Sequence, residues 1–297
     1  MKRNHNILTA ILLTGLAIVF TLASCQKSFD PKSYAPKKPA PTFGGYSASS
    51  QIEADSLIAY WNFSGTLTDS ISKLPGTASG SNFGGGILGQ AYQGSLTAYA
   101  VCKSSPALAA LQKCTISAWV NTTPPTTGLL DYFTLSNTTA FWGNIEMFFD
   151  NGSTNADAHL RIHLAQGTTD GTYSAEVPGC FNGWTHLVFS YDETGNCLLY
   201  MNGQPVITSK TSTVPLAPDT IPLPNGKKLT GALAFQNVGN VVFGCSQFMT
   251  NPSQTSGSDS QPWAAYFPGK IDQVRVYNKI LSANEVSALY SLENLGR

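Results

Sequence analysis

"GKIDQVRVYNKILSANEVSALY" runs from Gly269 to Tyr290 and decides the fold of this 297-residue chain. Its first half is rich in β-branched residues and predicts a strand over residues 270–278. Strict alternation along that strand predicts two faces. One face carries Ile271, Gln273 and Arg275, and the other carries Asp272, Val274 and Val276.

The second half of the stretch predicts a short helix. Ser282 can cap its first turn, and Glu285 three residues later can reach back to the cap amide, which is a capping box. Leu281 before the cap and Val286 after it form a hydrophobic staple. Val286, Leu289 and Leu292 form an apolar stripe, so we expect a helix that covers a sheet edge or the end of a sandwich and carries no catalysis.

Most of the remaining chain predicts short strands bounded by turn residues, which is typical of a β-sandwich or barrel. The "DETGN" turn at 192–196 predicts a hairpin, and the proline-containing stretch 208–239 predicts a long surface excursion. The clearest strands lie at Ser56–Phe63, Cys114–Val120, Asn144–Asp150, His159–Ala165, Trp184–Asp192, Cys197–Gly203, Asn240–Cys245 and Lys270–Asn278.

The Gly269–Tyr290 stretch resembles the C-terminal signature of the concanavalin A-like, laminin-G-like jelly-roll family, with Ile280 as its one interruption. Segments 57–70, 86–95 and 183–206 are similar to other parts of that family in the same order, although Gln93 stands where an acid is usual. The resemblance implies an all-β, two-sheet antiparallel jelly-roll sandwich with a short C-terminal helix over residues 56–297. The family contains lectin-like binders, adhesins and modules attached to enzymes, so the fold leaves the function open.

The N-terminus resembles a bacterial lipoprotein signal. Lys2 and Arg3 precede an apolar run at 7–22, and "LASC" ends at Cys25. We expect residues 1–24 to be a signal peptide, Cys25 to be lipidated, and the Pro/Lys/Ser-rich residues 25–55 to be a tether. The protein would then lie in the cell envelope, anchored to the outer membrane on its periplasmic or outer side, and would touch the membrane only through this anchor. A plain secretory signal or a membrane-anchor helix is the alternative.

Composition narrows the class of partner. Charged residues make up 11% of the chain and the net charge is zero, against about 25% charged residues in average proteins. Nucleic-acid binding needs a basic face, so it is excluded. A neutral surface of hydroxyl and amide groups with many aromatic residues suits carbohydrate, and we expect a monomer.

The cysteines leave their pairing open. Beyond Cys25 the count is odd, so at least one thiol stays outside any intrachain bridge. Cys102 and Cys114 could form a bridge across a short loop, and buried thiols are the alternative. The five are Cys102, Cys114, Cys180, Cys197 and Cys245.

No strand carries the paired acids of a glycoside hydrolase. Glu146 and Asp150 share a face, but Asp150 precedes a turn. His159 and His163, four residues apart on a strand, lie too far apart to bind one zinc ion. We therefore expect a non-catalytic protein with no catalytic residues, although an unrecognised hydrolase stays open.

The family resemblance implies a structural Ca²⁺ held by Asp69 and Asp272. Backbone carbonyls around residues 62–66 could complete its ligands. The alternative is that Asp69 only caps a turn and that Asp272 pairs with Arg275 or Lys270.

Carbohydrate binding is predicted on the face of two consecutive strands, opposite to the face that lines the core. Flat rings suit pyranose faces, and polar groups suit hydroxyls. The alternatives are an ordinary outer face or a second core, and, for the whole protein, an adhesion or protein-interaction module. The predicted residues are Trp142, Asn144, Glu146, Phe148, His159, Arg161 and His163, with Trp263 and Tyr266 at the rim.

Overall fold

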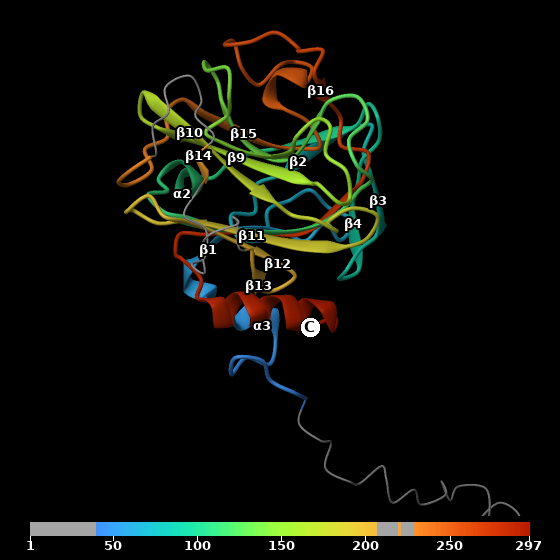
Figure 1. Ribbon diagram of the computed structural model, residues 1–297, viewed down its shortest axis with the longest axis vertical. Coiled ribbons are helices and arrows are strands. Elements are labelled where there is room, and N and C mark those ends of the chain that lie inside the picture. Colours follow the sequence, from blue (N-terminus) through green and yellow to red (C-terminus); the bar gives the residue numbers. More distant parts are fainter. Residues whose placement is uncertain (1–39, 207–218, 221–228) are drawn as a thin grey trace, which may run out of the picture. The chain divides into compact units, whose positions relative to one another are not determined.

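Two β-sheets face each other in the computed structural model (Figure 1). The structure describes residues 40–206, 219–220 and 229–297, and residues 42–297 form one compact unit. The predicted signal peptide, Cys25 and the tether up to residue 39 lie outside the described residues, as does most of the predicted excursion at 208–239. Among the described helices, none is long and apolar enough to cross a membrane.

The first sheet has eight strands in the order β13-β12-β11-β6-β17-β4-β3, with β1 paired beside β17. All its pairs are antiparallel. The strands are β1 (Leu57–Trp61), β3 (Asn82–Gly85), β4 (Gln90–Gln93), β6 (Cys114–Asn121), β11 (Thr185–Tyr191), β12 (Cys197–Met201), β13 (Gln204–Pro205) and β17 (Lys270–Tyr277).

The second sheet has nine strands in the order β14-β10-β9-β8-β7-β15-β5-β2, and β16 pairs with β7 in parallel. The strands are β2 (Gly76–Ser79), β5 (Tyr99–Cys102), β7 (Leu129–Asn137), β8 (Ile145–Phe149), β9 (His159–Gln166), β10 (Thr169–Glu176), β14 (Asp219–Thr220), β15 (Val238–Phe243) and β16 (Ala264–Ala265). Among the described residues, the α-helices are α2 (Pro106–Ala109) and α3 (Ala283–Asn294), and the 3₁₀ turns are η3 (Ser49–Gln51), η4 (Ala54–Ser56) and η5 (Gln247–Met249). This arrangement confirms the predicted jelly-roll sandwich.

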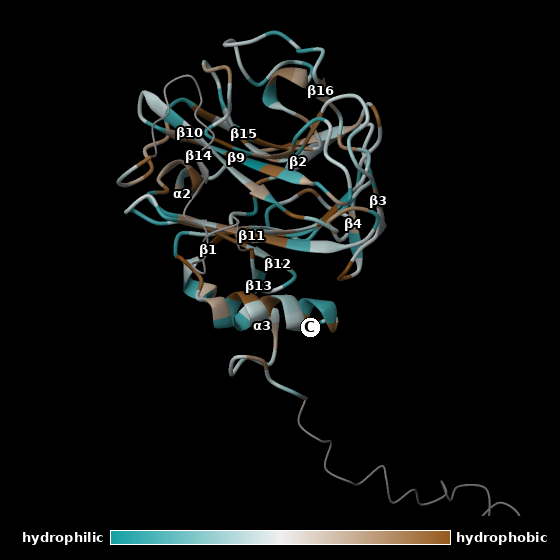
Figure 2. Cartoon of the chain, viewed as in Figure 1, coloured by the Kyte–Doolittle hydropathy of each residue, from teal (hydrophilic) through white to brown (hydrophobic). Residues whose placement is uncertain are grey.

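The core lies between the two sheets. Trp61 and Phe63 of the first sheet meet Phe243 of the second, with ring centroids 5.2 Å and 5.1 Å apart. Polar and apolar colours alternate along the strands in Figure 2, as expected for strands with one core face. The six residues predicted to line the core from the second sheet are all buried in it: Ile145, Met147, Phe149, Leu160, Ile162 and Leu164.

Strict alternation along β17 was a wrong prediction. The register with β6 shifts between Asp272 and Arg275, and Gln273 adopts a φ of 50°. This is a β-bulge, and its extra residue changes which side chains share a face. Ile271 therefore lies on the core side together with Val274 and Val276.

The C-terminal helix is as predicted. The Ser282–Glu285 capping box is present, and α3 packs on the outer face of the eight-stranded sheet (Figure 1). Its buried stripe meets Val188, Tyr200 and Tyr277 from that sheet. The helix side of this contact consists of Leu281, Val286, Ala288, Leu289 and Leu292.

The predicted tether ends earlier than residue 55. Ile52 is buried, and Phe43 and Tyr46 pack against the same cluster as α3. Ser49 N–H also donates to the Arg297 carbonyl at 3.3 Å. These apolar side chains cover one side of the helix, so the compact unit begins at Thr42.

Candidate functional site

The predicted binding strands β8 and β9 lie side by side, and β7 flanks β8. Glu146 pairs directly with Thr134 of β7 on one side and with His163 of β9 on the other. Phe148 pairs with Arg161 two residues further on. These side chains face away from the core, as the sequence indicates, and loops of the chain cover much of this face (Figure 1).

Five aromatic residues gather over this face, and we call them the aromatic cap: Phe141, Trp142, Phe148, Phe248 and Trp263. Trp142 lies at the centre, stacked on Phe148 at 5.8 Å with only 3° between the ring planes. Its ring centroid is 5.7 Å from those of His163 and Trp263. Predicted site residues from three separate segments therefore meet here. Phe141 and Phe248, which the sequence analysis missed, pack on one another at 5.5 Å.

A groove of about 270 Å³ runs along the edge of the cap, and we call it the Trp142 groove. Half-buried indole and phenyl rings meet polar side chains there. The side chains of Thr168, Asp170 and Gln236 make no hydrogen bond to any described residue, so they can bond a ligand. The lining residues that matter chemically are Phe141, Trp142, His163, Thr168, Asp170 and Gln236.

The two titratable groups of the Trp142 groove differ in charge. Burial lowers the pKa of His163 to about 3, so the imidazole is neutral at physiological pH. Its Nδ1 lies 3.3 Å from the Thr172 hydroxyl. Partial burial raises the pKa of Asp170. The groove therefore offers one carboxyl group and no cationic side chain among its described lining residues.

Seven of the nine predicted site residues do not line this groove: Phe148 and Trp263 belong to the aromatic cap beside it, and Asn144, Glu146, His159, Arg161 and Tyr266 lie elsewhere. His159 Nε2 lies 3.1 Å from Asp157 Oδ1, and Arg161 binds Asp150 at 2.6 Å. Tyr266 stacks on Tyr99 and donates to the Met249 carbonyl. Asn144 is fully buried, and its amide bonds the backbone of Ser136 and Gln236. Alternation along a strand predicts which face of the sheet a side chain lies on. It does not predict which loop or neighbouring side chain that residue contacts, so it could not separate these residues from those of the groove.

Glu146 is also absent from the groove. Its side chain is 0% exposed, and neither carboxyl oxygen has a hydrogen-bond partner among the described residues. Burial raises its pKa, the neighbouring charge of Asp131 raises it further, and the backbone N–H of Gly143 opposes the rise. Asp131 is a buried acid of β7 that the sequence analysis missed, because β7 itself was not recognised as a strand.

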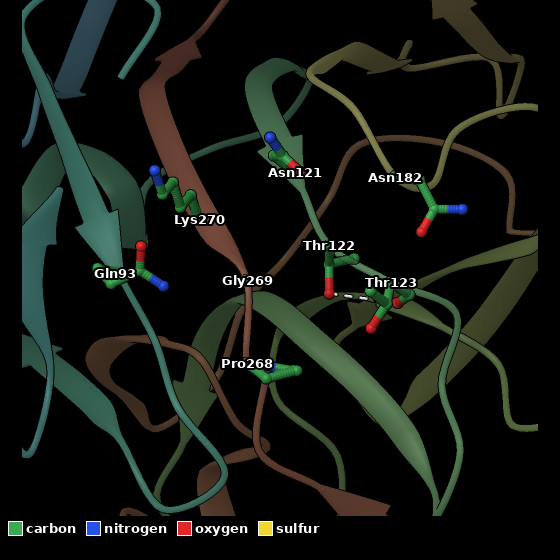
Figure 3. A pocket seen from close by; sticks show the side chains of 8 residues that line it. All are labelled: Gln93, Asn121, Thr122, Thr123, Asn182, Pro268, Gly269 and Lys270. Atoms are coloured by element: carbon green, nitrogen blue, oxygen red, sulfur yellow. Dashed lines mark hydrogen bonds between the residues drawn. The ribbon is translucent and has the colours of Figure 1, made fainter. Parts of the chain in front are cut away.

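A second groove, of about 440 Å³, lies where β4 and β6 end and β17 begins. Figure 3 shows the side chains that line it, spread around Gly269. Lys270 Nζ donates to the Gly85 carbonyl at 3.1 Å. Amide and hydroxyl groups dominate, and no aromatic ring lines it among the described residues. We call it the polar groove, and its main side chains are Gln93, Asn121, Thr122, Thr123, Asn182 and Lys270.

Asp69 closes its own turn. Its Oδ1 accepts from the Tyr60 and Ile71 amides at 2.8 and 2.9 Å, and its Oδ2 accepts from the amide and hydroxyl of Ser72. A carboxylate has about four acceptor sites. All of them are used by these donors, as in the turn-capping alternative.

Asp272 is buried and does not pair with Arg275 or Lys270, so that alternative is wrong. Its Oδ2 accepts from the Ile87 and Leu88 amides at 2.8 and 3.2 Å. Its Oδ1 accepts from the amide and side chain of Gln273 at 2.8 and 3.0 Å. Burial raises the pKa of Asp272 to about 6, and these donors oppose that rise. A Ca²⁺ shared with Asp69 would have to displace such donors, so this site stays a prediction.

The cysteines form no disulfide among the described residues. All five thiols are buried. Burial raises the pKa of Cys114 and of Cys180 to about 12. The Cys102–Cys114 bridge considered from the sequence is therefore wrong, and the buried-thiol alternative holds.

Comparison with known proteins agrees with the fold. Residues 94–236 match the family model described as the concanavalin A-like lectin/glucanases superfamily. No curated protein sequence matches the chain.

Solved structures give the same result. Domain 4 of AbnA, an extracellular arabinanase from Geobacillus stearothermophilus solved with arabinotriose, aligns with a TM-score of 0.51 and 18% identity, over 79% of this chain and 98% of its own. The binding domain of botulinum neurotoxin DC, solved with SialylT, aligns with a TM-score of 0.54 and 13% identity over 80% of this chain. This chain spans about half of the toxin domain, 52%. At such identities the likeness shows a shared fold.

Proposed function

We propose that this concanavalin A-like jelly-roll domain is a non-catalytic carbohydrate-binding module, and that the Trp142 groove is its binding site. One observation carries the proposal. A half-buried indole lines the same groove as three exposed polar side chains, those of Thr168, Asp170 and Gln236, which make no hydrogen bond to another described residue. That combination matches what a sugar ring offers, which is an apolar face surrounded by hydroxyls.

The charges of the groove favour a neutral glycan. His163 is neutral because it is buried, and Asp170 supplies a carboxyl group. A sugar acid would meet no cation in this groove and would approach Asp170. Hydroxyl groups, by contrast, can donate to Asp170 and exchange hydrogen bonds with Thr168 and Gln236.

The ligands of the structural neighbours support a carbohydrate. Domain 4 of AbnA was solved with arabinotriose and the toxin binding domain with SialylT. These two ligands differ in size and charge. The neighbours therefore support carbohydrate as the class of ligand. The side chains of the Trp142 groove determine which sugar binds.

Binding is favoured over hydrolysis because glycosidases need two carboxyl groups flanking one bond. Asp170 is the one acid among the described residues that line the Trp142 groove. Glu146 lies on the sheet below and is fully buried. A sugar in the groove would thus meet a single carboxylate.

The test is binding of the full chain to a glycan array, followed by calorimetry with the best neutral oligosaccharide. Trp142→Ala should weaken binding about tenfold or more, since a lost stacking contact of about 1.4 kcal/mol gives that factor. Asp170→Asn should weaken it less. Lys270→Ala in the polar groove is the matched control and should leave affinity unchanged.

Three results would overturn this assignment. Loss of binding in Lys270→Ala with unchanged Trp142→Ala would move the site to the polar groove. Release of reducing ends from a polysaccharide panel would make the protein a hydrolase. A chain that binds no glycan but captures a purified protein partner would be an interaction module.

We further propose that Cys25 is lipidated and holds this module on the cell envelope, at the outer membrane. The support is the sequence pattern that ends in "LASC". Mass spectrometry of the native protein should find a mature chain that begins with an acylated Cys25. An intact Met1 or an unmodified Cys25 would contradict the anchor.

A further inference from the structure

Four side-chain oxygens without partners lie together beneath the aromatic cap. They are Asp131 Oδ1, Thr134 Oγ1, and Oε1 and Oε2 of Glu146, and none has a hydrogen-bond partner among the described residues. All three side chains are 0% exposed. Buried polar groups are normally bonded, and each exception calls for a physical explanation.

The sheet makes these groups converge. Thr134 and Glu146 are direct cross-strand partners, so their side chains rise from neighbouring points of one face. The position that a Cβ on Gly143 would occupy lies 2.9 Å from Thr134 Cγ2 and 3.1 Å from Glu146 Cγ. The two side chains therefore border the same small space.

Asp131 reaches this space from two pairs further along the sheet, beyond a β-bulge between Asp131 and Phe133. It pairs with Phe148, the next outward residue of β8 after Glu146, which places the two acids on a diagonal. Ser246, from the loop that covers the face, donates its hydroxyl to Asp131 Oδ2. The hydroxyl of Ser246 thus holds one carboxyl oxygen of Asp131. The other, Oδ1, has no hydrogen-bond partner among the described residues.

No positive side chain balances these acids. Among the described residues, neither Asp131 nor Glu146 forms an ion pair with a lysine or arginine. His163, opposite Glu146, is buried, and its Nδ1 lies 3.3 Å from the Thr172 hydroxyl. Burying two acids without a counter-charge is costly, so a cation or protons must neutralise them.

We propose that Asp131, Glu146 and Thr134 bind a hard divalent cation, Ca²⁺, beneath the aromatic cap. Oxygen ligands of this kind, two of them carboxylates, are those that Ca²⁺ prefers. The ion would tie β7 and β8 together directly under the floor of the Trp142 groove.

This site differs from the one that the family resemblance implies. Asp69 and Asp272 have their acceptor sites filled by N–H and O–H donors. Asp131 and Glu146 have three carboxyl oxygens without partners among the described residues. The inference also stands apart from glycan binding, because metal content is measured without any sugar.

The test measures Ca²⁺ in the full chain by elemental analysis after purification in millimolar Ca²⁺ and desalting. Terbium luminescence excited through tryptophan gives a second readout, because Trp142 stacks on Phe148, the cross-strand partner of Asp131. We expect one Ca²⁺ per chain, and terbium emission that Ca²⁺ abolishes by competition. Glu146→Gln and Asp131→Asn keep the side-chain volumes and should each lower Ca²⁺ affinity at least 100-fold.

Asp272→Asn is the matched control and should keep the ion. A wild-type chain that binds no Ca²⁺ at millimolar concentration overturns the proposal, whether or not the variants fold. Binding that survives Glu146→Gln and Asp131→Asn but disappears in Asp272→Asn also overturns it, and would place the ion at the site implied by the family.

Discussion

Arg275 of β17 and Glu293 of α3 form an ion pair that is closed to solvent, with side chains 2% and 0% exposed. Glu293 Oε2 also accepts from Trp119 Nε1 at 2.7 Å and lies 3.8 Å from His186 Nε2. The final helix is therefore held on the sheet by a buried polar network as well as by its apolar stripe. Arg275 comes from the strand of the Gly269–Tyr290 stretch, and Glu293 comes from the last turn of α3, just beyond that stretch.

Removing one partner of this pair should destabilise the domain strongly. Glu293→Gln leaves the Arg275 guanidinium buried without a counter-charge, and such losses cost about 3–5 kcal/mol. Urea unfolding followed by tryptophan fluorescence measures the free energy of unfolding. Lys279→Met breaks the exposed pair with Glu53 and should lower the free energy of unfolding far less, because water screens that pair. Equal effects of the two variants would show that burial does not set the strength of the pair.

His186 should make stability depend on pH. Burial and the charge of Arg275 lower its pKa to about 3, while an unfolded histidine has a pKa near 6.5. The unfolded state binds more protons between these values, so the free energy of unfolding rises with pH across this window and falls on acidification. At pH 5 the loss should be about 2 kcal/mol relative to pH 7.5.

The difference between wild type and His186→Gln isolates this effect from that of other groups. Burial raises the pKa of Asp272 to about 6, and that shift acts in the opposite direction. Urea unfolding at pH 7.5 and at pH 5 should show a smaller loss for His186→Gln than for wild type. The same loss in both proteins would mean that His186 accepts a proton in the folded state.

Strand patterns predicted much of the fold from the sequence. All eight predicted strands are present, and the capping box and apolar stripe of α3 are where Ser282, Glu285 and Leu289 indicate. Strand β7 was missed although all nine of its residues are buried. Asp131, Thr134 and Ser136 give it a polar outward face, which is buried by loops from distant parts of the chain.

For the candidate site, the alternation of faces along each strand predicted which side chains share a face of the sheet and nothing more. Alternation placed Glu146, Phe148 and His163 on one face, and composition suggested that Trp263 joins them. It could not show that a covering loop buries Glu146, or that Arg161 turns to Asp150. The bulge at Gln273 could not be predicted from strict alternation either, because a bulge inserts one extra residue and shifts the alternation after it.

Asp272 gives a stability test that also addresses the predicted Ca²⁺ at this position. The loop around it is tight, since a Cβ on Gly86 would collide with Asp272 Oδ2. Asp272→Ala removes the acceptor of the Ile87 and Leu88 amides, and each buried amide left unpaired costs about 1–3 kcal/mol. We expect a fall of at least about 2 kcal/mol in the free energy of unfolding, measured in EDTA.

Melting with and without Ca²⁺ decides the second question. A bound ion at one hundred times its dissociation constant should add about 2.7 kcal/mol. If Asp69 and Asp272 hold the ion, Asp272→Asn removes that gain and Glu146→Gln keeps it. If the ion lies beneath the aromatic cap, the two variants behave in the opposite way. A wild-type midpoint that is the same in Ca²⁺ and in EDTA contradicts both sites.

The reactivity of the cysteine thiols tests both the folded domain and the proposed lipid anchor at Cys25. The five cysteines of the domain are at most 2% exposed and form no disulfide. Burial raises the pKa of most of these thiols, so little thiolate is present at pH 8, and the thiolate is the reactive form. The native protein should therefore react very slowly with Ellman's reagent.

Unfolding in guanidinium should release five thiols, although the chain contains six cysteines. The proposed lipidation of Cys25 would account for the difference, because it converts that thiol to a thioether. A count of six after unfolding, with one thiol that reacts rapidly in the native protein, would mean that Cys25 is unmodified. A count of three or fewer would mean that disulfides form in solution and would contradict the buried, reduced thiols of the folded domain.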